Sequence, residues 1–167
     1  MNIIKLSIKI AAFIIIPLAA CADTADIHKL NIGNKINVQL HEVTISGDTE
    51  SSNLPNGNIV FGSVSSPKTY LSKIIFSVKN KEYKLESKYM YNAWGRRPLE
   101  IAGVIKYFDA HCYNSENCTI RGIFSDAAGS FVAEWKVING KAIRTVITNS
   151  GDIVNNFIKD ISPPVYE

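Results

Sequence analysis

The feature that most constrains the fold is a pattern of alternating apolar residues around an Asn-Gly pair in the last third of the chain. Apolar side chains occupy every second position over residues 131–137, which is the spacing of a strand with one buried face. Asn139-Gly140 follows and suits the positive φ angles of a two-residue type I′ hairpin turn. A return strand over residues 141–148 then places Trp135 opposite Arg144, and we expect the arginine to cover the indole at the edge of a core.

Similar alternation runs through most of the preceding sequence, where turn residues separate the apolar segments. Asn80 is expected to turn one strand into the next, and a short polar loop is expected to join residues 101–108 to residues 119–124. The further strand candidates are residues 36–45, 59–64, 71–78, 83–85, 101–108 and 119–124.

The apolar spacing changes to that of a helix after residue 150. Asn149 or Ser150 is suited to cap the first turn, and Pro163-Pro164 ends the helix. The apolar residues that share one helical face are Ile153, Val154, Phe157, Ile158 and Ile161. We therefore predict an α+β fold, in which one C-terminal amphipathic helix packs on an antiparallel sheet of about six to eight strands, in preference to a plain sandwich.

The first 20 residues have the composition of an export signal. Lys5 and Lys9 precede an apolar run over residues 10–18, and small residues follow it. The run is shorter than the about 20 apolar residues that a membrane-spanning helix needs. We interpret residues 1–20 as a signal peptide.

The end of this signal is Leu18-Ala19-Ala20-Cys21, which resembles the lipobox of bacterial lipoproteins. The resemblance covers the leader alone. It implies that Cys21 is acylated and becomes the first mature residue, and that Ala22 favours the outer membrane. Two or three acyl chains anchor a protein firmly, whereas one chain holds it only marginally. Ordinary cleavage after Ala22 is the alternative, because small residues stand at positions 20 and 22.

After the signal we expect a polar tether over residues 21–35, which includes His28, and a single domain over residues 36–167. A domain of this length can bury one core of ordinary size.

Three cysteines leave one unpaired when two are joined. Cys112 and Cys118 flank a short polar loop, and an oxidising compartment allows them to pair. Cys21 is then the cysteine left for acylation. The alternative is a metal site formed by Asp109, His111 and the two loop cysteines, but it lacks the C-x-x-C spacing of such sites. We predict the disulfide, with no metal and no other cofactor.

The charge balance argues against nucleic acid as a partner. The chain carries 18 Lys and Arg against 15 Asp and Glu, a formal net charge of +3. Removal of the signal takes away Lys5 and Lys9 and leaves +1, well below the charge typical of a nucleic-acid-binding domain.

The sequence contains no G-x-S-x-G, H-E-x-x-H, P-loop or dinucleotide-binding pattern. A cell-envelope hydrolase is the alternative hypothesis, in which His111 with Asp109, or Ser125 with Asp126, supplies the reactive groups. It requires those pairs to converge in one pocket. Glu134 has no second carboxylate at a known distance, so glycosidase chemistry is unsupported. We assign no catalytic residue and favour a protein that is not an enzyme.

Residues 88–97 form the most suggestive binding segment. The segment is rich in Tyr, Trp, Met and Arg, which are enriched in protein interfaces and their hot spots. Aromatic faces and arginine forks also suit glycans and carboxylates. The competing interpretation is that alternate members of the segment are core residues. The predicted binding residues are Tyr89, Tyr91, Trp94, Arg96 and Arg97.

These features favour a non-catalytic envelope protein that binds another protein through this segment and the loop between Cys112 and Cys118. The chain is similar to periplasmic inhibitors and immunity proteins in size, expected location and general architecture. It shares no sequence motif with them. A rigid, disulfide-closed loop suits such a role, because it loses little entropy on binding. A glycan-binding component of the cell wall is a further alternative.

Overall fold

The computed structural model describes residues 25–33, 35–46, 54–93, 100–101, 104–105, 108–124 and 129–161. Most of the described strands belong to two four-stranded antiparallel sheets. The first sheet contains, in spatial order, β1 (Ala25–Gly33), β2 (Ile36–Thr44), β3 (Thr69–Val78) and β4 (Lys81–Leu85). The second contains β10 (Lys141–Thr148), β9 (Phe131–Ile138), β8 (Asn117–Phe124) and β7 (Phe108–Asn114). A separate short pair consists of β5 (Glu100–Ile101) and β6 (Val104–Ile105).

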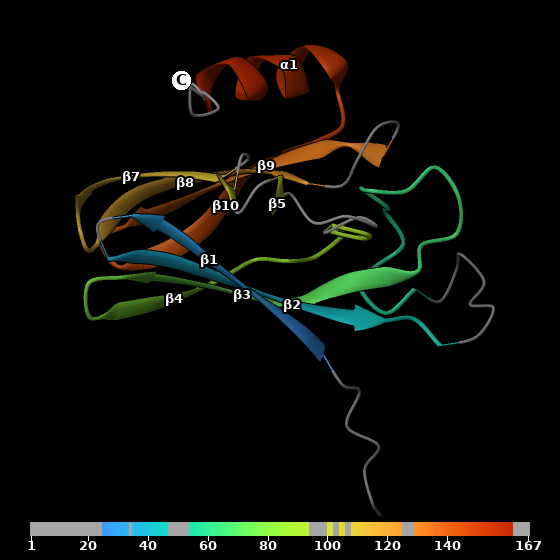
Figure 1. Cartoon of the computed structure of the whole chain (residues 1–167), viewed down its shortest axis with the longest axis horizontal. Coiled ribbons are helices and arrows are strands. Elements are labelled where there is room, and N and C mark those ends of the chain that lie inside the picture. Colours follow the sequence, from blue (N-terminus) through green and yellow to red (C-terminus); the bar gives the residue numbers. More distant parts are fainter. Residues whose placement is uncertain are drawn as a thin grey trace, which may run out of the picture.

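The elements are arranged in three layers (Figure 1). The two sheets face each other, and helix α1 (Gly151–Asp160) lies on the far side of the second sheet. β1 approaches β7 at one edge of the stack, and β4 approaches β10 at the other edge. The sheets are therefore packed face to face as in a β-sandwich, with a helix added as a third layer.

Two tight hairpins connect pairs of strands in each sheet. β1–β2, β3–β4, β7–β8 and β9–β10 are each joined through two residues. In the last of these turns Asn139 and Gly140 both have positive φ, as a type I′ turn requires. The predicted register is confirmed, with Trp135 opposite Arg144. The guanidinium of Arg144 donates hydrogen bonds to the carbonyl oxygen of Lys88 and to the carboxylate of Glu86.

The main core fills the space between the sheets, because successive inward-facing residues of each strand are apolar. Its centre is aromatic. The ring of Phe124 stacks on Phe131 at 5.1 Å between centroids and meets Phe108 and Trp135 edge-on at 5.2 and 6.0 Å. The indole N–H of Trp135 is satisfied by the carbonyl oxygen of Glu86. Contacts of this kind stabilise the core beyond the burial of area alone.

A second, smaller core lies between α1 and the outer face of the second sheet. Its buried members are Ile123, Val132, Val154, Phe157 and Ile161. Ile153 and Ile158 were expected on the same helical face but are 39% and 42% exposed. Ser150 occupies the predicted N-cap position, although its side chain makes no capping hydrogen bond. The helix was thus predicted correctly, but it buries a narrower stripe than expected.

The predicted single sheet of six to eight strands is imprecise. The described residues are mostly antiparallel strand with one C-terminal helix, as expected, but the eight strands of five or more residues among them are divided equally between two sheets. Residues 59–64 contribute an isolated bridge, from Phe61 to Met90, rather than a strand. Period-two alternation shows that each strand has one buried face, and it does not show whether a helix or a second sheet covers that face.

The tether expected over residues 21–35 is largely part of the domain. Residues 25–33 form β1, which pairs along its length with β2. Leu30 is buried in the main core, and His28 is half-buried instead of solvated. The sequence of β1 looks polar because it is an edge strand with one outward face. The folded domain therefore begins no later than residue 25.

Candidate functional site

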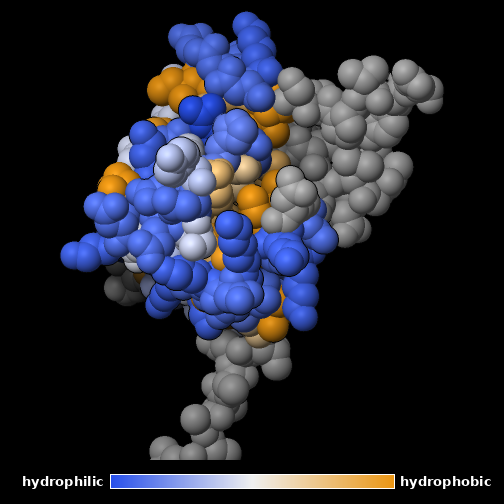
Figure 2. All heavy atoms as spheres, turned by 90° about the vertical axis from the view of Figure 1, so that its left-hand side faces the viewer, coloured by the Kyte–Doolittle hydropathy of each residue, from blue (hydrophilic) through white to orange (hydrophobic). Residues whose placement is uncertain are grey.

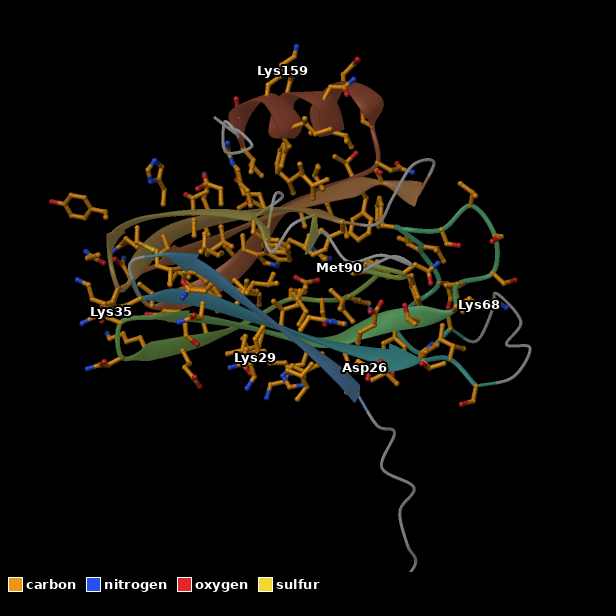
Figure 3. The ribbon with its side chains drawn as sticks, viewed as in Figure 1. Asp26, Lys29, Lys35, Lys68, Met90 and Lys159 are labelled. Carbon is orange, nitrogen blue, oxygen red and sulfur yellow. A yellow bond between two sulfur atoms is a disulfide. The ribbon has the colours of Figure 1, made fainter. Side chains whose placement is uncertain are left out.

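The predicted binding segment is divided between the core and the surface. Tyr91 is completely buried, as are its neighbours Met90 and Ala93. Figure 3 shows Met90 between the two sheets. Tyr89 is half-buried, and the ammonium of Lys88 lies 4.7 Å from the centre of its ring. The centre of the segment is therefore core, but its buried residues are not the alternate set that the competing interpretation expected.

Trp94, Arg96 and Arg97 lie outside the described residues. Their part in binding stays a prediction.

A buried polar cluster explains why Tyr91 faces inward. Its hydroxyl accepts a hydrogen bond from the backbone N–H of Asn56 at 2.9 Å and donates one to the carbonyl oxygen of Gly57 at 2.7 Å. Burial raises the pKa of the Tyr91 phenol, and nearby Tyr70 adds to this rise, although the Asn56 N–H opposes it. The side-chain amide of Asn56 in turn donates to the carbonyl oxygen of Ser87 at 2.8 Å. Tyr91 thus fastens residues 54–57 to the body of the domain.

The predicted disulfide is present between Cys112 and Cys118. The two cysteines are directly opposite each other on β7 and β8. Because both sulfur atoms are used in this bond, the alternative metal site loses its thiolate ligands. Among the described residues, no cluster of three or more His, Cys, Asp or Glu side chains is placed to hold a metal ion.

The loop closed by the disulfide is held by both sheets. From the first sheet, Lys81 forms an ion pair with Glu116, and the hydroxyl of Tyr83 donates to the carbonyl oxygen of Ser115 at 2.7 Å. From the second sheet, the N–H of Gly140 donates to the carbonyl oxygen of Glu116 at 3.1 Å. The tip is therefore fixed relative to the whole sandwich, and not only to its own hairpin.

Tyr113 is the residue that this fixed loop presents to solvent. It stands at a β-bulge, where the register shifts between Cys112 and Asn114, and bulges commonly redirect a side chain. Its side chain is 94% exposed. Figure 2 views this end of the sandwich, where hydrophilic side chains surround a small apolar area. An aromatic residue presented on a rigid loop can contact a partner with little loss of conformational entropy.

Two residues of the hydrolase hypothesis, Asp109 and His111, belong to the second sheet. Asp109 and His111 lie on its outer face, two positions apart on β7, and His111 is exposed. Ser125 and Asp126 lie outside the described residues. The last described residue before them, Phe124, is five residues beyond Thr119, the partner of His111. Five strand residues span about 17 Å, so Phe124 lies far from His111, and convergence of the two pairs stays a prediction.

Glu134 is a structural carboxylate rather than a reactive one. It is buried, and it accepts hydrogen bonds from Nε of Arg121 and Oγ1 of Thr145, each at 2.8 Å. Burial alone would raise its pKa, but the hydrogen bonds from Thr145 and Arg121 outweigh this effect and hold the pKa below its usual value. Arg121 also binds Asp160 at 3.1 Å, which ties α1 to the sheet.

Sequence reasoning missed an inward-facing polar group in the first sheet, at the end away from the disulfide-closed loop. Glu42 is buried, its carboxylate accepts a hydrogen bond from Thr69, and it lies 3.3 Å from Nε2 of His28. The side-chain oxygen of Asn92 accepts from the backbone N–H groups of Lys68 and Thr69. The position of Glu42 in the sequence could have indicated this, because the even-numbered residues of β2 point inward. These contacts join three strands and satisfy the buried groups.

Comparison with known proteins finds no matching family model, no matching curated protein and no matching solved structure. Within the part of the chain that the structure describes, no helix has the length and apolar character needed to cross a membrane.

Proposed function

We propose that this chain is an exported, lipid-anchored envelope protein that binds another protein without catalysis, in the manner of an inhibitor or immunity protein. The observation that carries this proposal is the disulfide-closed loop, which both sheets hold and which presents an almost fully exposed Tyr113. A loop of this kind loses little conformational entropy on binding, and tyrosine is among the residues that dominate interface energetics.

The proposed cellular location rests on the leader sequence. Leu18-Ala19-Ala20-Cys21 resembles a lipobox, and the disulfide is suited to an oxidising compartment. Intact mass of the purified mature protein tests this part of the proposal. We expect an N-terminal Cys21 that carries acyl chains. A mature chain that begins at Asp23 without lipid would show that the signal is an ordinary one.

The binding role is tested by capture from envelope extract with matched variants. We expect Tyr113→Ala to reduce retention of the partner by at least tenfold, in line with hot-spot losses above about 1.4 kcal/mol. Val64→Ala is the control, because Val64 is also strongly exposed, at 81%, on a different loop. Trp94→Ala and Arg96→Ala form a second arm that tests the rest of the predicted segment. Equal retention by all variants would exclude these residues as the binding surface.

An inhibitor also changes the activity of what it binds. The purified protein is expected to lower the rate at which a lysozyme-like enzyme clears a peptidoglycan suspension, and Tyr113→Ala is expected to relieve that effect. Retention on isolated peptidoglycan itself, unaffected by Tyr113→Ala, would instead favour the glycan-binding alternative.

A further inference from the structure

The outer face of the first sheet is unusually rich in lysine. The strand pairings place Ile27, His41 and Lys73 in one row across β1, β2 and β3. The next row crosses all four strands. Its members are Lys29, Gln39, Ile75 and Lys84. We call the surface formed by these two rows the basic face.

The lysines of the basic face are exposed, and they form no ion pair with another described residue. Lys29, Lys73 and Lys84 all have exposed side chains, and no carboxylate among the described residues forms an ion pair with them. One acidic residue, Glu82, points outward from the described strands of this sheet, where it accepts a hydrogen bond from Ser77. With three lysines against Glu82, and with Asp26 exposed beside Ile27, the face carries a net positive charge.

The opposite side of the molecule has a different charge pattern. There Arg121 is paired with Glu134 and Asp160, and α1 carries Asp152 and Lys159. Figure 3 shows Lys159 on the outer side of α1, and Lys29 on the side of the sandwich away from that helix. The net charge of the chain is therefore small, although charged residues are distributed differently on its two faces.

The basic face is also close, along the chain, to the proposed anchor. β1 begins at Ala25 and forms one edge of this sheet. Cys21 precedes Ala25 by four residues, and four extended residues span at most about 14 Å. Acyl chains on Cys21 would therefore hold the start of β1 within about 14 Å of the bilayer surface, which is less than two Debye lengths of about 8 Å at physiological salt.

We propose that the basic face docks on the anionic phospholipid headgroups of the leaflet that holds the acyl chains of Cys21. The proposal rests on the lipid anchor proposed above. Anionic headgroups attract lysines near the membrane surface. Ile27, which is 51% exposed beside His41 and Lys73, supplies an apolar side chain for the interfacial region. In this orientation α1 points away from the membrane, and the loop with Tyr113 stays accessible to a partner.

The test uses the mature chain from residue 21 with Cys21→Ser, which retains every described residue and carries no lipid. Its partitioning is measured by sedimentation with vesicles of phosphatidylcholine alone, and with vesicles that contain 30% phosphatidylglycerol. Each lysine near an anionic surface contributes about fivefold to the partition constant, so loss of three predicts a decrease of about a hundredfold. The test variant combines Lys29→Gln, Lys73→Gln and Lys84→Gln.

A charge-matched control separates a defined face from net charge. It combines Lys68→Gln, Lys141→Gln and Lys159→Gln, at exposed positions outside the basic face. Thermal unfolding of both variants verifies that the fold is retained. The proposal predicts that the control keeps binding within about fivefold of the parent. Equal losses in the two variants, or no preference of the parent for anionic vesicles, would overturn it. Because the chain tested is unlipidated, these outcomes are independent of whether Cys21 is acylated.

Discussion

Replacing Tyr91 by phenylalanine separates a structural role for this residue from the binding role that the sequence suggested. The substitution removes one hydroxyl from a fully buried side chain. It leaves the N–H of Asn56 and the carbonyl oxygen of Gly57 without the partner that each now has at 2.9 and 2.7 Å. The ring itself keeps its place in the core, so little packing is lost.

The magnitude follows from the two groups left unsatisfied. A buried donor or acceptor without a partner costs about 1–3 kcal/mol. Asn56 and Gly57 are only half-buried, so water can reach them in part, and we expect about 2 kcal/mol in total. For a domain of this size that corresponds to a decrease in Tm of about 6–10 °C.

Guanidinium unfolding followed by tryptophan fluorescence measures the change. The midpoint concentration should fall with no change in the slope m, because the surface exposed on unfolding is unaltered. Tyr113→Phe is the matched control, since its hydroxyl is exposed, and we expect it to alter stability by less than about 0.5 kcal/mol. A similarly small effect of Tyr91→Phe, combined with loss of partner capture, would refute the structural assignment.

Three further predictions concern other parts of the fold. Replacing Cys112 and Cys118 together by serine should lower the free energy of unfolding by about 2 kcal/mol, as expected for closure of so short a loop, and this is measured by denaturant titration. The depressed pKa of Glu134 stabilises the folded state above the ordinary glutamate pKa, and that contribution is lost as the pH falls through the folded-state value; Glu134→Gln should remove this component from the dependence of Tm on acid pH. Gly62→Ala should prevent stable folding, because φ is +96° and the added Cβ would lie 1.8 Å from the carbonyl oxygen of Tyr91.

Each of these has a control within the chain. Reducing agent should destabilise the parent to the level of the double serine variant and leave that variant unchanged. Glu82→Gln, at an exposed position, should leave the acid limb of the Tm profile unaltered. Gly151→Ala adds a methyl group where no atom lies within 4 Å and should be tolerated. Destabilisation by Gly151→Ala as large as that by Gly62→Ala would contradict the steric explanation.

Features that depend on neighbouring residues were predictable from the sequence. The turn at Asn139-Gly140, and the register that follows from it, are decided by local backbone preference and alternation. The disulfide was predictable because Cys112 and Cys118 are close in the chain. The helix was predictable from its apolar spacing, although Ile153 and Ile158 proved more exposed than expected.

Features that depend on distant parts of the chain were not predictable. No local signal indicates that eight strands divide into two sheets, since either arrangement buries one face of each strand. β1 was missed because Asp26, Lys29 and Asn31 interrupt its apolar residues, and among its described side chains Leu30 alone is buried. Tyr91 was assigned to a surface because aromatic residues suit both cores and interfaces. Its hydrogen-bond partners at residues 56 and 57 are more than thirty positions away.

The order of the strands has a consequence for how the protein folds. Within each sheet, hydrogen-bonded neighbours are consecutive in the chain, with β1 to β4 in one sheet and β7 to β10 in the other. Each sheet can thus form as a meander from its own consecutive strands, and it needs no strand from the other half of the chain. Local pairing of this kind lowers the contact order and accelerates folding relative to sandwiches with crossing connections. Because synthesis begins at the N-terminus, the first sheet can form before β7 has been made, and docking of the two finished sheets becomes the late step.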